Sequence, residues 1–221
     1  KEPYAMKHRF TANYARRAEG FKIEYENDYR ELLGSFDAGL KVSIKNPEVY
    51  QFYGFGNETK AEETIINQSD VRLNRYAFQG RISKWSRLKA SRISLLLGYE
   101  NIFLTQARFV DLSAERKTDN LLSVGLAYQY KNTDSEIHPA KGIEFNLEGI
   151  QTNGMNNNEV NFFKLNTHFS LFIPLNMFKK QTTLASRLGY ANNFGDYRFY
   201  QANFLSGMQQ MRGLSRNRFA G

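Results

Sequence analysis

The stretch NFFKLNTHFSLFIPL, residues 161–175, alternates between mainly apolar and polar side chains from Phe163 to Leu171. One set of alternate positions is mainly apolar: Phe163, Leu165, Thr167, Phe169, Leu171 and Ile173. The other set is polar: Lys164, Asn166, His168 and Ser170. Side chains of a β-strand point alternately to opposite faces, so this pattern predicts a strand with one apolar and one polar face. The stretch is longer than the ~9–11 residues that a strand needs to cross a bilayer at a tilt.

The same alternation recurs along the chain, which predicts an all-β, antiparallel fold with about ten strands. The expected strands are centred on residues 10–14, 21–25, 36–44, 50–56, 76–82, 93–99, 122–130, 143–147, 163–173 and 184–190. Short connections alternate with long polar ones, which we expect at residues 57–70 and 106–120. Tight turns on one side and long loops on the other are typical of a transmembrane β-barrel of the outer-membrane type.

Charged residues indicate which face of these strands meets lipid. They occupy the positions that alternate with the apolar residues, and the predicted lumen-lining residues are Arg75, Arg81, Arg92, Glu144, Glu148, Lys164, His168 and Arg187. A basic side chain on the lipid face at the bilayer midplane would cost about 2–4 kcal/mol, whereas a water-filled lumen accepts it. The sequence therefore predicts a charged lumen and an apolar surface in contact with outer-membrane lipid.

The composition argues against several other classes of protein. The chain has 221 residues and no cysteine, so it has neither disulfides nor thiolate metal sites. Its net charge is +8, but the basic residues are scattered singly, which argues against a nucleic-acid partner. Mean hydropathy is −0.58, and no apolar run approaches the ~20 residues of a membrane helix.

Enzymatic chemistry is not expected. The three histidines, His8, His138 and His168, are far apart and lack the spacing of a metal site. Glu144 and Glu148 share a face and could be imagined as an acid/base pair, yet such carboxylates are ordinary in barrel interiors, so lumen lining is the better explanation. No Ser or His constellation suited to lipid modification or proteolysis can be assembled. We therefore predict no catalytic residue, no metal and no cofactor.

The last stretch, NFLSGMQQMRGLSRNRFAG at residues 203–221, is polar, broken by glycines and basic. At its centre Arg212 stands between Met211 and Gly213. A planar guanidinium on such a loop is suited to one carboxylate or aromatic partner of defined geometry. Taken alone, an Arg-Gly pair in a loop is most simply a solvated turn.

The carboxy-terminal third gives this pair a context. From residue 130 onward the chain presents a turn (HPAKG), a strand (IEFNLEG), the long strand quoted above, a further strand (TTLASRLGYA) and then NFLSGMQQMRGL. This order resembles the barrels of the BamA, TamA and FhaC superfamily, the bacterial surface antigen family, whose members insert or translocate other proteins. The resemblance implies the outer membrane of a Gram-negative bacterium, contact with lipopolysaccharide, client outer-membrane or secreted polypeptides, and accessory lipoproteins as further partners.

The resemblance also assigns a functional loop. In the family, an apolar-Arg-Gly-aromatic motif lies on a long outer loop that folds back into the lumen. The residues that match this loop are Met211, Arg212, Gly213 and Leu214, with Gly207 as the glycine that precedes the motif. Leu214 departs from the usual aromatic residue, so no stacking role is carried over to it. The implied inward loop is residues 194–221 of a single partial barrel domain, residues 1–221.

A larger barrel is implied as well. Barrels of this family commonly have about sixteen strands, and open sheet edges are not tolerated in hydrocarbon. We therefore expect closing strands after Gly221 and a strand before Lys1, with the carboxylate partner of Arg212 on a later strand. The stretch FYGFGNET, residues 52–59, resembles Bacteroidetes members of the superfamily, including ones fused to an amino-terminal metallophosphoesterase domain.

Three functions stay open on the sequence alone. The preferred one is a barrel for protein insertion or translocation, in which the loop around Arg212 braces the lumen. The second is a passive porin with a charged lumen, and bilayer conductance would separate the two. The third is a membrane anchor for an enzymatic domain encoded upstream of Lys1, which the full-length sequence would reveal.

Overall fold

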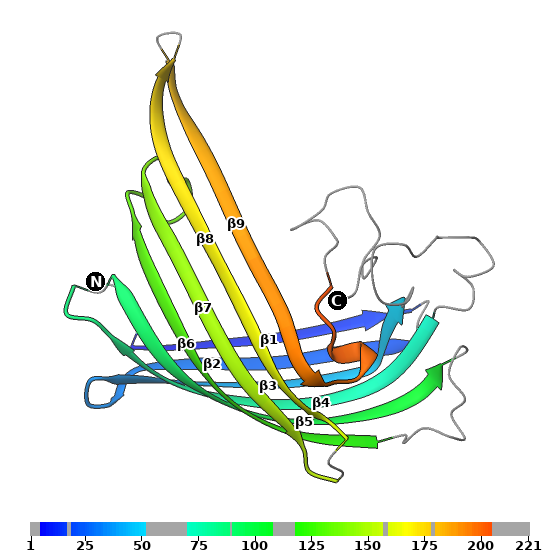
Figure 1. Ribbon diagram of the computed structural model, residues 1–221. Helices are drawn as coiled ribbons and strands as arrows, with labels where there is room; N and C mark the ends of the chain where they lie inside the picture. The colour runs from blue at the N-terminus through cyan, green and yellow to red at the C-terminus, as the bar shows by residue number, and fades with distance from the viewer. Residues whose placement is uncertain are drawn as a thin grey trace.

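A computed structural model describes residues 5–16, 19–51, 70–88, 90–107, 118–156, 159–177 and 180–204. These residues form one antiparallel sheet of nine strands, in which each strand pairs with its neighbours in sequence (Figure 1). The strands are β1 (Met6–Ala15), β2 (Gly20–Leu33), β3 (Phe36–Gln51), β4 (Asp70–Trp85), β5 (Ser91–Ala107), β6 (Thr118–Thr133), β7 (Gly142–Gly154), β8 (Asn161–Met177) and β9 (Lys180–Asp196). The prediction of an all-β antiparallel fold is confirmed.

The sheet is strongly curved, so that it has a concave and a convex face (Figure 1). After β9, the chain turns onto the concave face, where Phe199–Gln201 forms a single 3-10 turn, η1. None of the described residues forms a helix long and apolar enough to span a membrane. Because the strands reach 17 residues in β5, β8 and β9, they are much longer than the ~5–6 residues usual in globular sheets.

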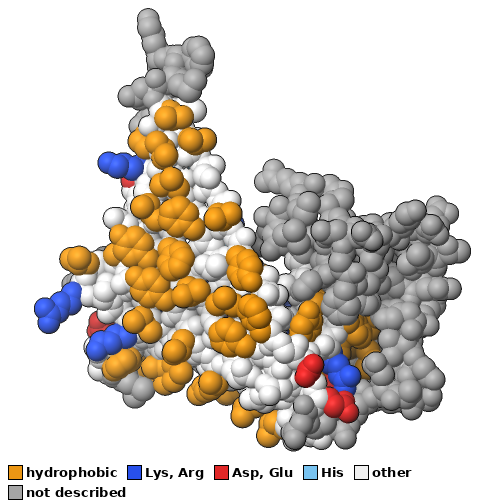
Figure 2. All heavy atoms as spheres, in the orientation of Figure 1, with side chains coloured by type: hydrophobic (Ala, Val, Ile, Leu, Met, Phe, Trp, Pro, Cys, Tyr) orange, Lys and Arg blue, Asp and Glu red, His pale blue; other side chains and the backbone are white. Residues whose placement is uncertain are grey.

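The convex face is apolar and exposed. In β5 and β6, for example, Leu95 pairs with Leu126 and Leu97 with Val124, and all four side chains are exposed. Figure 2 shows hydrophobic side chains gathered over the long strands β7 to β9. Further exposed members of this surface are Phe10, Tyr14, Tyr76, Phe78, Ile82, Phe163, Phe169, Ile173, Leu184, Leu188 and Tyr190. An apolar surface of this extent marks contact with a membrane or with another protein.

The concave face carries the charges. In β2 and β3, Glu26 pairs in register with Lys41, and their side chains form an ion pair of 2.7 Å. Arg9 of β1 reaches the same glutamate at 3.3 Å. Strand periodicity thus sorts the side chains as the sequence predicted, with apolar residues on one face and charged residues on the other.

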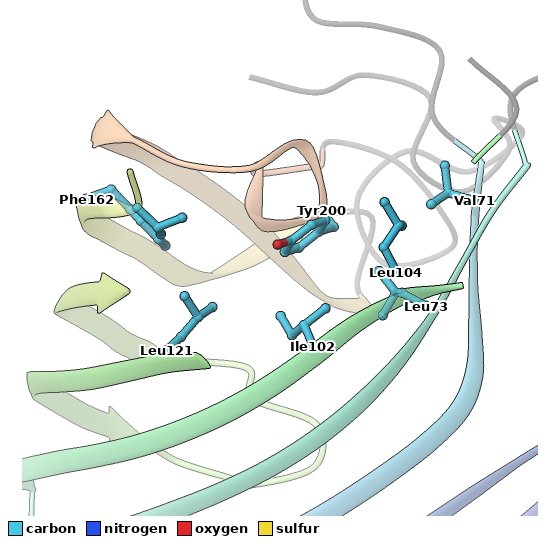
Figure 3. Close-up of a cluster of buried hydrophobic side chains, with 8 residues drawn as sticks. Val71, Leu73, Ile102, Leu104, Leu121, Phe162 and Tyr200 are labelled. Carbon is cyan, nitrogen blue, oxygen red and sulfur yellow. The ribbon is translucent and has the colours of Figure 1, made fainter. Parts of the chain in front are cut away.

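One end of the concave face is apolar and closely packed. Its buried cluster consists of Val71, Leu73, Ile102, Leu104, Leu121, Val160, Phe162 and Tyr200. Figure 3 shows the Tyr200 ring above the sheet, with Leu121 and Phe162 on one side and Leu73 and Leu104 on the other. This cluster fixes η1 to the sheet.

Strand boundaries differ from the expected ones in several places. The expected separate strand at residues 50–56 begins as the last two residues of β3, and the rest of it lies outside the described residues. β5 continues to Ala107 and β6 begins at Thr118, so both strands extend into the connection expected at 106–120. β8 and β9 pair as far as Met177 and Lys180, five residues beyond the end of the β7–β8 ladder at Phe172.

Candidate functional site

A cavity of about 620 Å³ opens on the concave face. Its floor is formed by strands β2 to β8, and Tyr200, Gln201 and Ala202 close one end of it. The charged residues that line it are Glu26, Asp28, Lys41, Arg75, Arg81, Glu100, Glu148 and Lys164. The cavity therefore joins a charged central zone to the apolar cluster under η1.

Arg75 is the centre of one charged group on this face. Its Nε lies 2.9 Å from Glu48 Oε2 and its Nη1 lies 3.3 Å from Glu100 Oε2, so strands β3, β4 and β5 are tied together. Lys45 Nζ lies 2.5 Å from the other oxygen of Glu48. Because these groups neutralise one another, the face presents both signs of charge and no single ligand charge is favoured.

Arg81 and Arg92 lie nearer the other end of the sheet. Arg81 of β4 forms an ion pair with Asp28 of β2 across the intervening strand. Arg92 of β5 donates a hydrogen bond of 2.9 Å to Gln129 and lies 5.1 Å from the centre of the Trp85 ring. Both arginines border a second, smaller cavity of about 210 Å³.

The remaining predicted lumen residues lie on β7, β8 and β9. Glu144 forms an ion pair of 3.0 Å with Lys131, and Glu148 accepts a hydrogen bond of 3.1 Å from Asn166. These different partners give no sign of a shared proton between the two carboxylates. Lys164 of β8 lies in the cavity wall. The His168 Nε2 atom lies 2.7 Å from Asn146 Nδ2. Arg187 of β9 pairs in register with Ser170 of β8.

Sequence reasoning missed a buried polar contact of this face that joins residues far apart in the chain. The segment of residues 197–204, which we call the strap, places Tyr200 so that its hydroxyl donates a hydrogen bond to Asp119 Oδ2 at the start of β6. Asp119 is 3% exposed and Tyr200 is 7% exposed. Burial raises the pKa of the Tyr200 phenol and the hydrogen-bonded Asp119 carboxylate raises it further, so the phenol stays protonated and acts as the donor.

Arg198 connects the strap to the β7–β8 connection and to the start of β6. Its Nη2 lies 2.8 Å from Glu159 Oε2, and its Nε lies 3.7 Å from Asp119 Oδ2. On β9, Asn193 donates a hydrogen bond of 3.0 Å to the Gln201 carbonyl oxygen and accepts one of 3.1 Å from Asn203. No spacing in the sequence signals these contacts, because Asp119 and Tyr200 are 81 residues apart.

Several predicted features stay predictions. The motif residues Met211, Arg212, Gly213 and Leu214, together with Gly207, lie outside the described residues, as does the FYGFGNET stretch at 52–59. For the same reason the inward loop at 194–221 and the single domain at 1–221 are described only in part. Within the described ranges no three His, Asp or Glu side chains cluster as a metal site would require.

Comparison with known proteins adds the family-level result. The model of the Omp85 superfamily domain matches residues 5–221. Among solved structures, the crystal structure of BamA from Haemophilus ducreyi lacking POTRA domains 1–3 superimposes with a TM-score of 0.65 at 16% sequence identity, over 90% of this chain. The match covers 38% of the chain in that crystal structure, and at such low identity the likeness shows a shared fold. No curated protein sequence matches significantly.

Proposed function

The chain belongs to the Omp85 superfamily, and from that membership we propose that it is part of an outer-membrane barrel that inserts or translocates polypeptides. The resemblance to the BamA, TamA and FhaC superfamily is confirmed at the level of family and fold. The single observation that best supports the proposal is the two-faced sheet: a broad exposed apolar convex face opposite a charged concave face with a cavity.

The convex face fits a position in the outer membrane of a Gram-negative bacterium, against lipid and lipopolysaccharide. Exposed leucine, phenylalanine and tyrosine side chains there would be costly in water and are favourable in hydrocarbon. The charged concave face would then line a hydrated lumen, where Glu26, Lys41 and their neighbours remain solvated. The proposed partners are client outer-membrane or secreted polypeptides, with accessory lipoproteins.

Clients would be handled as strands. A polypeptide entering a bilayer must satisfy its backbone hydrogen bonds, and pairing with a strand edge of the barrel does so in hydrocarbon. In the proposed mechanism the lateral seam of the barrel pairs with client strands, and the inward loop around Arg212 braces the lumen while they pass. Gly213 would allow the sharp turn that aims the guanidinium inward.

The test uses the full-length protein in its own host. Arg212→Ala should leave a folded barrel at normal abundance, seen as heat-modifiable migration on gels, but reduce client insertion severalfold. Arg216→Ala, in the same stretch but outside the motif, is the matched control and should retain insertion. Normal growth and client insertion in the Arg212→Ala strain, at wild-type abundance, would overturn the proposal.

A further inference from the structure

Arg92 of β5 differs from the neighbouring arginine of the concave face in having no carboxylate beside it. Arg81 of β4 is paired with Asp28. Arg92 forms no ion pair with any carboxylate in the part of the chain that the structure describes, and its Nη2 donates a hydrogen bond of 2.9 Å to the neutral Gln129 side chain. Its positive charge is therefore left unmatched by the residues around it.

The surroundings of Arg92 explain why no nearby acid neutralises it. The guanidinium lies 5.1 Å from the centre of the Trp85 ring. Trp85 Nε1 donates a hydrogen bond of 2.8 Å to Asp37 Oδ2, and Asp37 Oδ1 accepts one of 3.0 Å from the Glu31 N–H, so both oxygens of this carboxylate have other donors. Arg92 is half-buried, and its Nε is buried without a hydrogen-bond partner among the described residues. A buried donor without an acceptor is costly, whereas an arginine in open water needs no partner.

A cavity of about 210 Å³ lies beside Arg92 and has room for a small ligand. Its charged, amide and serine lining residues are Arg81, Arg92, Ser94, Gln129, Asn146 and Glu148. We propose that Arg92 and this cavity form a carboxylate-binding site, which takes an acidic side chain of a polypeptide. Because Asp28 already neutralises Arg81 and Glu148 adds a negative charge to the wall, a singly charged carboxylate fits the cavity better than a doubly charged phosphate.

The donors at the site match a carboxylate. A guanidinium presents its N–H groups in a planar fork that can bind both oxygens of a carboxylate at once. Gln129 accepts from Arg92 through Oε1, so its amide N–H groups remain able to donate to the same ligand. The Trp85 ring covers one face of the guanidinium and keeps water from it, which strengthens an ionic hydrogen bond there.

The site lies at the end of the sheet that has short turns. Trp85 is the last residue of β4 and Arg92 is the second residue of β5. The long connections, residues 52–69 and 108–117, leave from the opposite ends of these strands. Short turns of outer-membrane barrels face the periplasm, so in the proposed barrel the site is at the periplasmic mouth of the lumen, where clients arrive. This role rests on the proposed function, whereas carboxylate binding itself does not.

Trp85 can report binding directly, because it is the only tryptophan in this chain and lies against Arg92. The experiment uses full-length protein in vesicles, with any tryptophan outside this chain replaced by phenylalanine. Titration with N-acetylglutamate α-amide, which carries a single carboxylate, should change the Trp85 emission saturably. N-acetylglutamine α-amide has nearly the same shape without the charge and should give no change.

Variants assign the binding to Arg92. Arg92→Gln should weaken it about tenfold or more, because the charge-assisted hydrogen bonds are lost. Arg92→Lys should be intermediate, since it keeps the charge without the planar fork. Arg187→Gln is the matched control: Arg187 is an exposed arginine on β9 that lines neither cavity, and its loss should leave the affinity unchanged. Heat-modifiable migration shows that each variant is folded.

A second variant supplies the missing carboxylate from within the chain. Gln129→Glu places an acid where Arg92 already makes a hydrogen bond, so it should pair with the arginine, abolish binding of the capped glutamate and leave the barrel folded. Unchanged affinity in folded Arg92→Gln and Gln129→Glu would overturn the site. Inorganic phosphate that binds as tightly as the capped glutamate would overturn the choice of a carboxylate.

The role in client handling is measured separately. In the host, Arg92→Gln should reduce insertion of clients at normal barrel abundance, whereas Arg187→Gln should not. Lost binding of the capped glutamate together with normal client insertion would retain the site and overturn its role in insertion. Because binding is measured without a client, failure of the site and failure of the proposed function give different results.

Discussion

Asp28 on β2 forms an ion pair with Arg81 on β4, across the whole width of the intervening strand β3. The pair crosses β3 at Gly39, where an added Cβ would lie 2.8 Å from Asp28 Oδ1 and 3.3 Å from Arg81 Nη2. Gly39 pairs in register with both residues. A side chain at this position would therefore occupy the space in which the two charged groups meet.

We predict that Gly39→Val abolishes the energetic coupling between Asp28 and Arg81. In the parent protein, a double-mutant cycle with Asp28→Asn and Arg81→Gln should give a coupling on the order of 0.5 kcal/mol, because both side chains are partly exposed. In the Gly39→Val background the coupling should fall to near zero. Urea unfolding in lipid vesicles measures it. Gly80→Val is the control, since an added Cβ there meets nothing within 4 Å.

The two faces of the sheet should respond oppositely to a new charge. Leu126 lies on the convex face of β6 and is 62% exposed, so in the proposed barrel it meets lipid. Leu126→Arg should lower the free energy of unfolding in vesicles by about 2–4 kcal/mol. Gln79→Arg, on the cavity side of β4, should change it little. Equal costs at the two positions would contradict the assignment of the convex face to lipid.

The turn between β6 and β7 should carry a pH-dependent contribution to stability. Backbone N–H groups hold the pKa of Asp134 below its ordinary value: Lys141 N donates at 3.0 Å and Ala140 N at 2.9 Å. A depressed carboxyl pKa stabilises the folded state above the unfolded pKa of about 4, and this contribution is lost as pH falls through the folded pKa.

Asp134→Asn should therefore flatten the pH dependence of the stability of this turn below about pH 4. Hydrogen exchange at the Ala140 and Lys141 amides, followed from pH 6 downward, measures the effect. Protection in the parent protein should decrease as Asp134 is protonated, while protection in the variant should change little. Glu136→Gln, in the same turn, is the matched control and should keep the pH dependence of the parent.

Some elements were readily predicted because their signal is local. The alternation in residues 161–175 reappears as β8, and the apolar and charged sets of β4, β5 and β6 lie on opposite faces as expected. Strand ends were predicted less well, since mixed composition hides the period in Asp70–Trp85 and Ser91–Ala107, both of which extend beyond the alternating core. In those regions pairing with a neighbouring strand, not side-chain pattern, sets the boundary.

The sequence by itself determined the strand period, the two-faced character of the sheet and the family resemblance, because each depends on residues that are near one another in the chain. Only the tertiary structure decided that Asp28 reaches Arg81 over Gly39, and that Asp119 receives the Tyr200 hydroxyl. Both contacts depend on how the sheet curves and how its strands are aligned. A long-range pair of this kind leaves no local pattern, since register and curvature emerge only when all the strands are assembled.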